Sequence, residues 1–155
     1  MTIKKIISGG QTGADQAGLD AAIVCGILHG GSIPKGRKTE NGILDSRYKL
    51  DELESSSYGV RTEKNVTDSD GTVIFSQGPL TEGSLLTRHK AEFHNKPVLH
   101  LDFTAYQLEE SVILLDRFIR ENQIAILNIA GPRASKDPQI YTLTYNCLLA
   151  GLRDL

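Results

Sequence analysis

The chain has 155 residues, which fits one domain, and carries a formal net charge of −2. Hydrophobic residues make up 39% of it and charged residues 23%, a globular composition that excludes an intrinsically disordered chain. The slight acidity argues against a surface for duplex nucleic acid, because such surfaces carry a basic excess. A membrane span is also not expected, because every apolar run is shorter than the roughly 18 residues that a spanning helix needs.

The N-terminus and the cysteines indicate the cellular compartment. Residues 1–5 lead directly into a strand-like segment and lack the apolar region of a signal peptide. Cys25 and Cys147 lie in apolar helical stretches, and their spacing matches neither a metal motif nor a disulfide framework. We therefore expect a cytoplasmic protein with two core thiols, a single domain over residues 1–155 and no metal site.

Short apolar runs alternate with segments of helical periodicity along the chain. The first half predicts a strand at 3–8, a helix at 14–25, a short strand at 27–30, an irregular segment at 31–57 and a short helix at 61–68. The second half predicts strands at 72–75, 98–102 and 124–129, and helices at 84–94, 105–122 and 137–152. In the last helix, Asp137 suits the N-cap position and Pro138 the first turn.

Strands that alternate with helices are typical of right-handed β–α–β units and a parallel sheet. We therefore expect the α/β class, with a Rossmann-like three-layer sandwich around a mainly parallel sheet of about five strands. In such sheets ligands bind beyond the carboxyl ends of the strands. The loops that follow the predicted strands are thus the candidate ligand-binding segments.

The first of these loops joins the first strand to the first helix and is rich in glycine. Glycines let an anion approach the backbone, and the helix N-terminus supplies free N–H groups. A carboxylate at Asp15 would repel a phosphate, so we expect Asp15 either to cap the helix or to hold a ribose hydroxyl. The alternative is a tight turn without a ligand. The expected ligand contacts are Gly9, Gly10, Gln11, Thr12, Gly13 and Asp15.

Two further loops are expected at the same edge of the sheet. Residues 76–84 place glycine and hydroxyl groups at a helix N-terminus, where Ser84 is also a plausible N-cap. Residues 130–136 bring two cations, and an arginine can clamp a phosphate through two N–H groups. The alternative for this last loop is a solvated surface segment. The candidate contacts are Glu82, Gly83, Ser84, Gly131, Arg133 and Ser135, with Lys136 as a second cation.

The irregular segment follows the second predicted strand and can therefore also reach the site. Lys35 and Arg37 are its candidate anion ligands, although a charge run of this kind is more often a solvated face. Tyr58 and Arg61, just before the third strand, are weaker candidates of the same kind.

Several stretches of the chain together resemble the circularly permuted YpsA-like branch of the SLOG superfamily. They are SGGQTGADQAGLDAA, PKGRKTENG, RTEKNVTDSDGTVIF, GSLLT and NIAGPRAS. Proteins of this branch are often labelled molybdenum carriers, and the superfamily includes nucleotide phosphoribohydrolases of the LOG, or lysine decarboxylase-like, type. The resemblance implies a Rossmann-like fold and a phosphorylated ligand. Molybdopterin-type cofactors and nucleotides are the two classes it points to, and the residues do not choose between them.

The chain departs from the hydrolase pattern of the superfamily. The segment 79–87 resembles a PGGxGTxxE-like loop, but Thr87 stands where that motif has the catalytic glutamate. Asp15 stands where the first motif usually has an apolar residue. The hydrolase chemistry is therefore not carried over to this chain by the resemblance.

Three functions follow as alternatives. The first is a binding protein for a phosphorylated nucleotide-like ligand, either a molybdopterin carrier or a nucleotide sensor. The second is a nucleotide-processing hydrolase that cleaves an N-glycosidic or phosphate bond with Asp15 or Glu82. The third is a single-strand nucleic-acid or protein-interaction module, which the low aromatic content of 6% disfavours. The resemblance also implies self-association, as a homodimer or a higher homo-oligomer, and helices 84–94 and 105–122 are the candidate interfaces.

Overall fold

Five parallel strands form the central sheet of the structure, a computed structural model that describes residues 3–153. Their order across the sheet is β2-β1-β9-β7-β8, and each strand runs parallel to its neighbours. The predicted sheet is thereby confirmed, while residues 1–2 and 154–155 of the predicted domain lie outside the described part. The strands are β1 (Lys5–Ser8), β2 (Leu28–Gly30), β7 (Gly71–Ser76), β8 (Val98–Asp102) and β9 (Ile126–Ala130).

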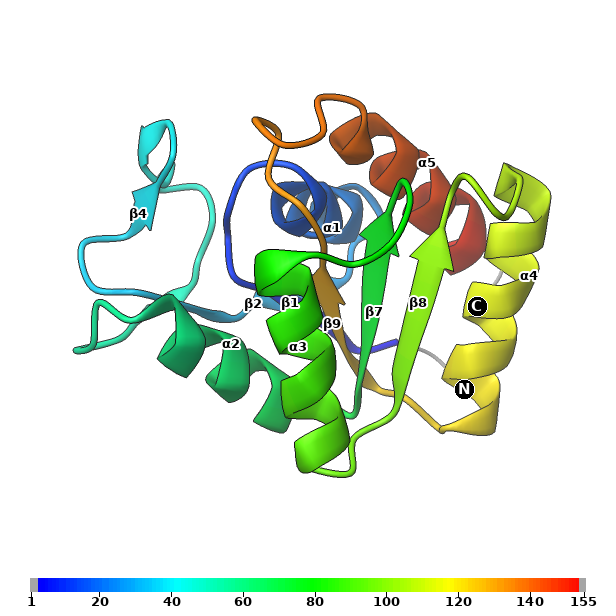
Figure 1. Ribbon diagram of the computed structural model, residues 1–155, viewed down its shortest axis with the longest axis horizontal. Coiled ribbons are helices and arrows are strands. Elements are labelled where there is room, and N and C mark those ends of the chain that lie inside the picture. The colour runs from blue at the N-terminus through cyan, green and yellow to red at the C-terminus, as the bar shows by residue number, and fades with distance from the viewer. Residues whose placement is uncertain (1–2, 154–155) are drawn as a thin grey trace.

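Helices cover both faces of this sheet (Figure 1), which confirms the three-layer sandwich. One face carries α1 (Ala14–Val24), α4 (Leu108–Glu121) and α5 (Ile140–Leu152), and α5 packs between the other two. The other face carries α2 (Tyr58–Thr67) and α3 (Glu82–Phe93), which pack against each other. Within residues 3–153, none of the helices combines the length and the apolar character that crossing a bilayer requires.

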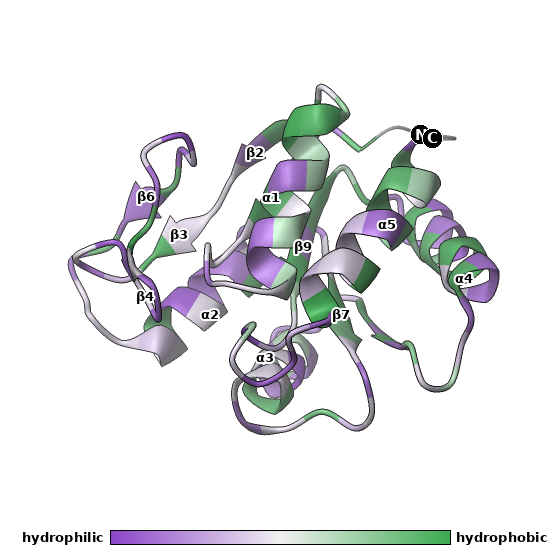
Figure 2. Cartoon of the chain, turned by 90° about the horizontal axis from the view of Figure 1, so that it is seen from above, coloured by the Kyte–Doolittle hydropathy of each residue, from purple (hydrophilic) through white to green (hydrophobic). Residues whose placement is uncertain are grey.

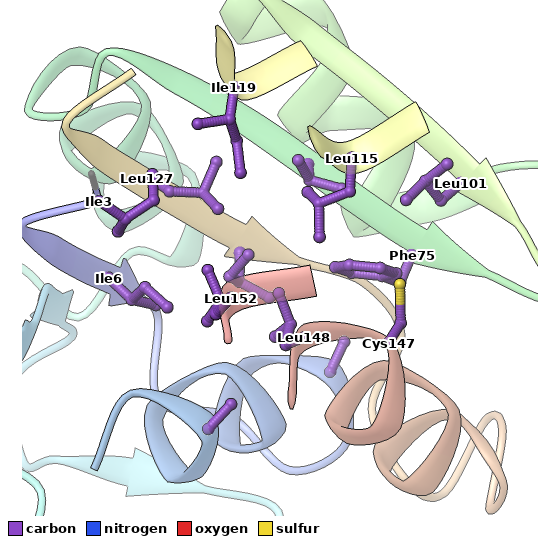
Figure 3. Packing of buried hydrophobic residues seen from close by; sticks show 14 of the residues in the cluster. Ile3, Ile6, Phe75, Leu101, Leu115, Ile119, Leu127, Cys147, Leu148 and Leu152 are labelled. Atoms are coloured by element: carbon purple, nitrogen blue, oxygen red, sulfur yellow. The ribbon is translucent and has the colours of Figure 1, made fainter. Parts of the chain in front are cut away.

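The main core lies between the sheet and the α1, α4 and α5 layer. Figure 3 shows Phe75 and Leu127 of the sheet packed beside Leu115 and Leu148 of the helices. Every residue of β7 is buried, as expected for a central strand whose two faces are both covered. Both cysteines belong to this core: one is fully buried and the other is half-buried at the end of α1.

The segment predicted to be irregular, residues 31–57, contains two small sheets. β3 (Ser32–Ile33) pairs in parallel with β6 (Asp51–Glu52), and β4 (Lys38–Thr39) forms an antiparallel hairpin with β5 (Gly42–Ile43). Figure 2 shows the segment beside α2 and away from α4. A second core fixes it to α1, made of Leu19, Ile33, Leu44, Tyr48 and Leu50.

One buried amide joins this segment to α2. The Asn65 Oδ1 atom accepts a hydrogen bond from the Ser32 N–H at 2.8 Å, and its Nδ2 donates to the Ser32 carbonyl at 3.0 Å. Asn65 and Ser32 are both buried. The two bonds therefore mimic the pairing that a neighbouring strand would give to β3.

Two helix starts differ from the sequence prediction because local hydrogen bonds decide them. The helix α2 begins at Tyr58 rather than at residue 61, since the Ser57 side chain accepts the Val60 N–H. The helix α3 begins at Glu82 with Thr81 as its N-cap residue. Ser84 therefore lies inside the first turn, and its prediction as the N-cap was wrong.

The last two helices, in contrast, begin later than predicted. The helix α4 begins at Leu108, because the segment from residue 105 first forms a turn on the Asp102 carbonyl. The helix α5 begins at Ile140, with Gln139 as its N-cap residue. Asp137 is therefore not the cap: its carboxylate accepts the Gln139 N–H at 3.0 Å and closes the preceding turn.

Candidate functional site

A cavity of about 340 Å³ opens at the carboxyl ends of three adjacent strands. β9 lies between β1 and β7 in the sheet, so the loops that follow these strands meet there. The N-terminal turns of α2 and α3 complete the walls. The volume lies within the range of roughly 300–1,000 Å³ that is typical of small-molecule sites. The strand order thus brings together the three loops that the sequence placed on one edge.

One wall of the cavity is positively charged. Arg133 and Lys136 line it from the loop after β9. The first turn of α3 lies beside them with Gly83, whereas the Ser84 N–H of this turn already donates to the Thr81 carbonyl at 3.1 Å. This combination of cations and a helix N-terminus favours an anionic group.

Glu82 lies at the rim of this wall in an unusual backbone conformation. Its φ of 45° is in the left-handed region, which is strained for a residue with a side chain. Its carboxylate forms an ion pair with Lys136, and 69% of the side chain is exposed. Glu82 therefore orients a cation and is poorly placed to reach a group deep in the cavity.

The inner wall carries a buried carboxyl group, that of Asp15. Its Oδ2 atom accepts the Gln11 N–H at 3.2 Å and lies 3.4 Å from Nη1 of Arg61. Burial raises the pKa of Asp15 to about 6, although Arg61 and the N–H groups of Gln11 and Gly9 act in the opposite direction. Asp15 closes the first loop instead of capping α1, whose N-cap position is Gly13. A carboxyl group that titrates near neutrality inside a cavity is a candidate for proton transfer or for binding a donor.

Gln11, which also lines the cavity, has an unsatisfied acceptor. Its Nε2 donates to the carbonyl oxygens of Gly9, at 3.2 Å, and Lys38, at 3.0 Å, which fixes the orientation of the amide. Its Oε1 is buried and finds no hydrogen-bond partner among residues 3–153. Leaving a buried acceptor unpaired costs about 1–3 kcal/mol, so a ligand that donates a hydrogen bond at this point would be favoured.

Half of the predicted contact residues line the cavity. Gly9 lines a smaller hollow that adjoins the cavity next to Asp15. The other glycines of the first loop serve its packing: a Cβ on Gly13 would lie 2.3 Å from the Pro132 carbonyl oxygen, and Gly10 packs against Leu44 and Leu50. The predicted residues that line the cavity are Gln11, Asp15, Glu82, Gly83, Ser84, Gly131 and Arg133.

The predicted cations of the irregular segment lie away from the cavity lining. Arg37 donates through Nη2 to the carbonyl oxygens of Asp45 at 3.0 Å and Tyr48 at 2.9 Å, and so holds its own loop together. Lys35 is exposed to solvent. Thr12 and Ser135 also lie outside the lining, where both donate to the Glu40 carboxylate.

Helix α2 contributes more to the cavity than the sequence indicated. Tyr58 and Arg61 line it, although they were predicted only as weaker candidates, and Thr62 was not predicted. Thr62 and Asn65 are buried polar residues on the inner face of this short helix. The sequence signal was the pair Thr62 and Asn65, whose spacing of three places two polar residues on one helix face. A helix that only covers a core has apolar residues on that face.

Two hydroxyl groups of the lining have structural partners. Thr87, at the position of the hydrolase glutamate, is buried and donates to the Gly83 carbonyl at 3.0 Å. The Ser76 Oγ lies 2.6 Å from both the Gly78 carbonyl oxygen and the His100 Nε2 atom. Because the carbonyl can only accept, the Ser76 proton points to Gly78 and His100 is the donor. Ser76 is thus not oriented as a nucleophile.

Comparison with known proteins gives two matches over nearly the whole chain. The model of the circularly permutated YpsA SLOG family matches residues 6–152. Among solved structures, a protein named "Putative molybdenum carrier protein" from Syntrophus aciditrophicus SB is 50% identical, with a TM-score of 0.95. The similarity covers 97% of this chain and 95% of that chain. A search of curated proteins gave no match.

Proposed function

Since the chain belongs to the circularly permuted YpsA SLOG family, we propose that it binds a phosphorylated, nucleotide-like ligand in the cavity at the carboxyl ends of β1, β9 and β7. The observation that carries this proposal is the polarity of the cavity. Cations and a helix N-terminus form one wall, and buried acceptors form the inner wall. Such a site is complementary to a molecule with a phosphate at one end and hydrogen-bond donors at the other.

The phosphate is assigned to the outer, positive wall. Arg133 and Lys136 reach it from the same loop, and the N-terminus of α3 lies beside them. Charge-assisted hydrogen bonds from such groups are stronger than neutral ones. The ion pair between Lys136 and Glu82 holds a cation at the rim before the ligand arrives.

The donor groups of the ligand are assigned to the inner wall. The unpaired Oε1 of Gln11 accepts a hydrogen bond from an N–H or a hydroxyl group, and the carboxylate of Asp15 does the same. A ribose, a purine amino group and the ring of a pterin all supply such donors. The inner wall therefore supports nucleotides and molybdopterin equally well.

The name of the similar structure makes a molybdenum cofactor one candidate ligand, and the residues fit its organic part. The cavity has the size and the cations for a pterin with a phosphate. Cys147 does not offer a thiolate ligand for the metal, because burial raises the pKa of its thiol to about 12. Among the described residues there is also no cluster of three His, Cys, Asp or Glu side chains that could hold a metal ion. In a carrier role, the metal would be cargo held through its pterin.

A second candidate function, hydrolysis of a nucleotide at its N-glycosidic bond, is favoured by one observation. Asp15 places a carboxyl group with a pKa of about 6 in the same cavity as Thr87, which replaces the glutamate of the related hydrolases. A general acid or base works best when its pKa lies near the working pH. Release of free base from a nucleoside monophosphate by wild-type protein, and its loss in Asp15→Ala, would support this function.

The binding proposal is tested by a thermal-shift panel on the purified protein. The panel contains nucleoside mono-, di- and triphosphates, ADP-ribose, molybdopterin and molybdate. A ligand at 100 times its dissociation constant adds about 2.7 kcal/mol of stability, which raises Tm by roughly 5–10 °C for a chain of this size.

We expect a selective rise for one phosphorylated class, which Lys136→Ala reduces. The matched control is Arg117→Ala, which removes an exposed cation of α4, on a helix that does not line the cavity. A panel without any rise, or a rise equal in both variants, would contradict the proposal.

A further inference from the structure

Loops at the cavity hold an anion that belongs to the chain itself, the carboxylate of Glu40. The hydroxyl groups of Thr12 and Ser135 both donate to it, and the Ser135 N–H donates as well, at 3.2 Å. The Thr12 Oγ1 atom accepts the Ala134 N–H at 3.1 Å, so its own proton is directed at Glu40. These bonds, together with the charge of Arg133, lower the pKa of Glu40, which is therefore ionised at neutral pH.

The donor set has the composition of an anion-binding site. Three donors from two different loops converge on one carboxylate, and a guanidinium lies near them. Thr12 is buried, with 6% of its surface exposed, so its hydroxyl is fixed in place without needing Glu40. A phosphate oxygen accepts the same hydrogen bonds as a carboxylate oxygen, and carries more charge. The site is therefore suited to a phosphate group as well.

Glu40 reaches this point from a hairpin that is otherwise open to solvent. The hairpin of β4 and β5 stands away from the central sheet in Figure 1. Its tip, residues 40–43, is exposed, including 78% of Ile43, whereas Leu44 at its base is buried in the second core. The carboxylate can thus leave its donors without opening a core.

We propose that Thr12, Ser135 and Arg133 form a second anion subsite, which Glu40 fills in the free protein and a phosphate group of the ligand fills in the complex. Arg133 also lines the cavity, so it connects the two positions. This inference rests on the proposed function, in which the natural ligand is phosphorylated. A ligand with two phosphoryl groups places one at the N-terminus of α3 and the other at this subsite. Nucleoside diphosphates and dinucleotides are then preferred over monophosphates.

The test uses inorganic phosphate as the probe and calorimetric titration of the whole chain. Glu40→Ala removes the internal competitor, and Glu40→Gln keeps its size but removes its charge. If Glu40 fills the subsite at least nine-tenths of the time, both variants bind phosphate at least about tenfold tighter than the wild type. Asn41→Ala is the matched control, because this neighbour is also exposed on the hairpin tip.

The gain in affinity must depend on the proposed donors. It is expected to disappear in Glu40→Ala/Ser135→Ala and in Glu40→Ala/Thr12→Val, and to persist in Glu40→Ala/Lys136→Ala. Unchanged phosphate affinity in both Glu40 variants, or a gain that survives the loss of either hydroxyl, would overturn the proposal. If only the subsite proposal is wrong, nucleotides still raise the Tm of the wild type. If only the ligand assignment is wrong, the Glu40 variants still bind phosphate more tightly than the wild type. The two failures are therefore distinguishable.

Discussion

The Asp15 carboxylate and the Arg61 guanidinium lie 3.4 Å apart on the inner wall of the cavity, although 46 residues separate them in the chain. Only 7% of the Asp15 side chain and 15% of the Arg61 side chain are exposed. The pair joins the first loop to α2 and so closes the cavity on its inner side. The ion pair with Arg61 offsets the cost of burying the Asp15 carboxylate only in part, because the pKa of Asp15 still rises to about 6.

Asp15 should therefore make stability depend on pH. Because its pKa is higher in the folded chain than the ordinary 3.8, the folded state binds this proton more tightly. The resulting stabilisation is complete below about pH 4 and is lost as the pH rises through 6. Relative to Asp15→Asn, the wild type should lose about 2–3 kcal/mol between pH 4 and pH 7, since one pKa unit corresponds to about 1.4 kcal/mol.

Urea unfolding of both proteins at pH 4, 5, 6 and 7 measures this difference. Asp51→Asn, at an exposed carboxyl group in β6, is the control and should follow the wild type. Parallel stability curves for the wild type and Asp15→Asn would show that Asp15 does not titrate in this range.

Close approach of the first and third loops should depend on Gly13. Its φ of 81° disfavours a side chain, and an added Cβ would lie 2.3 Å from the Pro132 carbonyl oxygen. Gly36 has a similar φ of 89° but open space around it, so a substitution there introduces the backbone strain without the clash. We expect Gly36→Ala to cost about 1 kcal/mol and Gly13→Ala at least about 3 kcal/mol. Equal urea midpoints for the two variants would mean that the loops can separate at no cost.

Asn65 should hold the segment 31–57 to the body of the protein. Asn65→Ala leaves the N–H and the carbonyl group of Ser32 buried without partners, which should cost about 2–4 kcal/mol. Asn122→Ala is the comparison, since it removes a single amide hydrogen bond at the end of α4 and should cost less. Limited proteolysis should cut Asn65→Ala first within residues 31–57, because this segment loses its anchor. First cleavage elsewhere would contradict this role.

The elements and the edge of the sheet that carries the site are predictable from the sequence because they depend on local patterns. The apolar run of β7 and the glycines that follow β1 are examples. Helix starts are less predictable, since side chains such as Ser57 and Asp137 have several possible hydrogen-bond partners and only the packed structure chooses among them.

The positions of individual side chains around the cavity depend on contacts between distant segments. Arg61 meets Asp15 only because α2 packs against β3 and α3 near the first loop, and Arg37 turns to carbonyl groups of its own loop. The place of β9 between β1 and β7 is likewise a property of the sheet order, which local patterns do not encode. The sequence thus favoured Arg37 over Arg61, whereas packing places Arg61, and not Arg37, in the cavity lining.

The most direct test of ligand binding is calorimetric titration of the wild type, Arg133→Ala and Arg117→Ala with ADP and with molybdopterin. We expect the wild type and Arg117→Ala to bind one of these ligands with equal affinity. Arg133→Ala should bind it at least about tenfold more weakly, because hydrogen bonds to charged groups contribute about 1.5–3 kcal/mol. Absence of binding to both ligands in the wild type, or equal affinity in all three proteins, would contradict a phosphorylated ligand in this cavity.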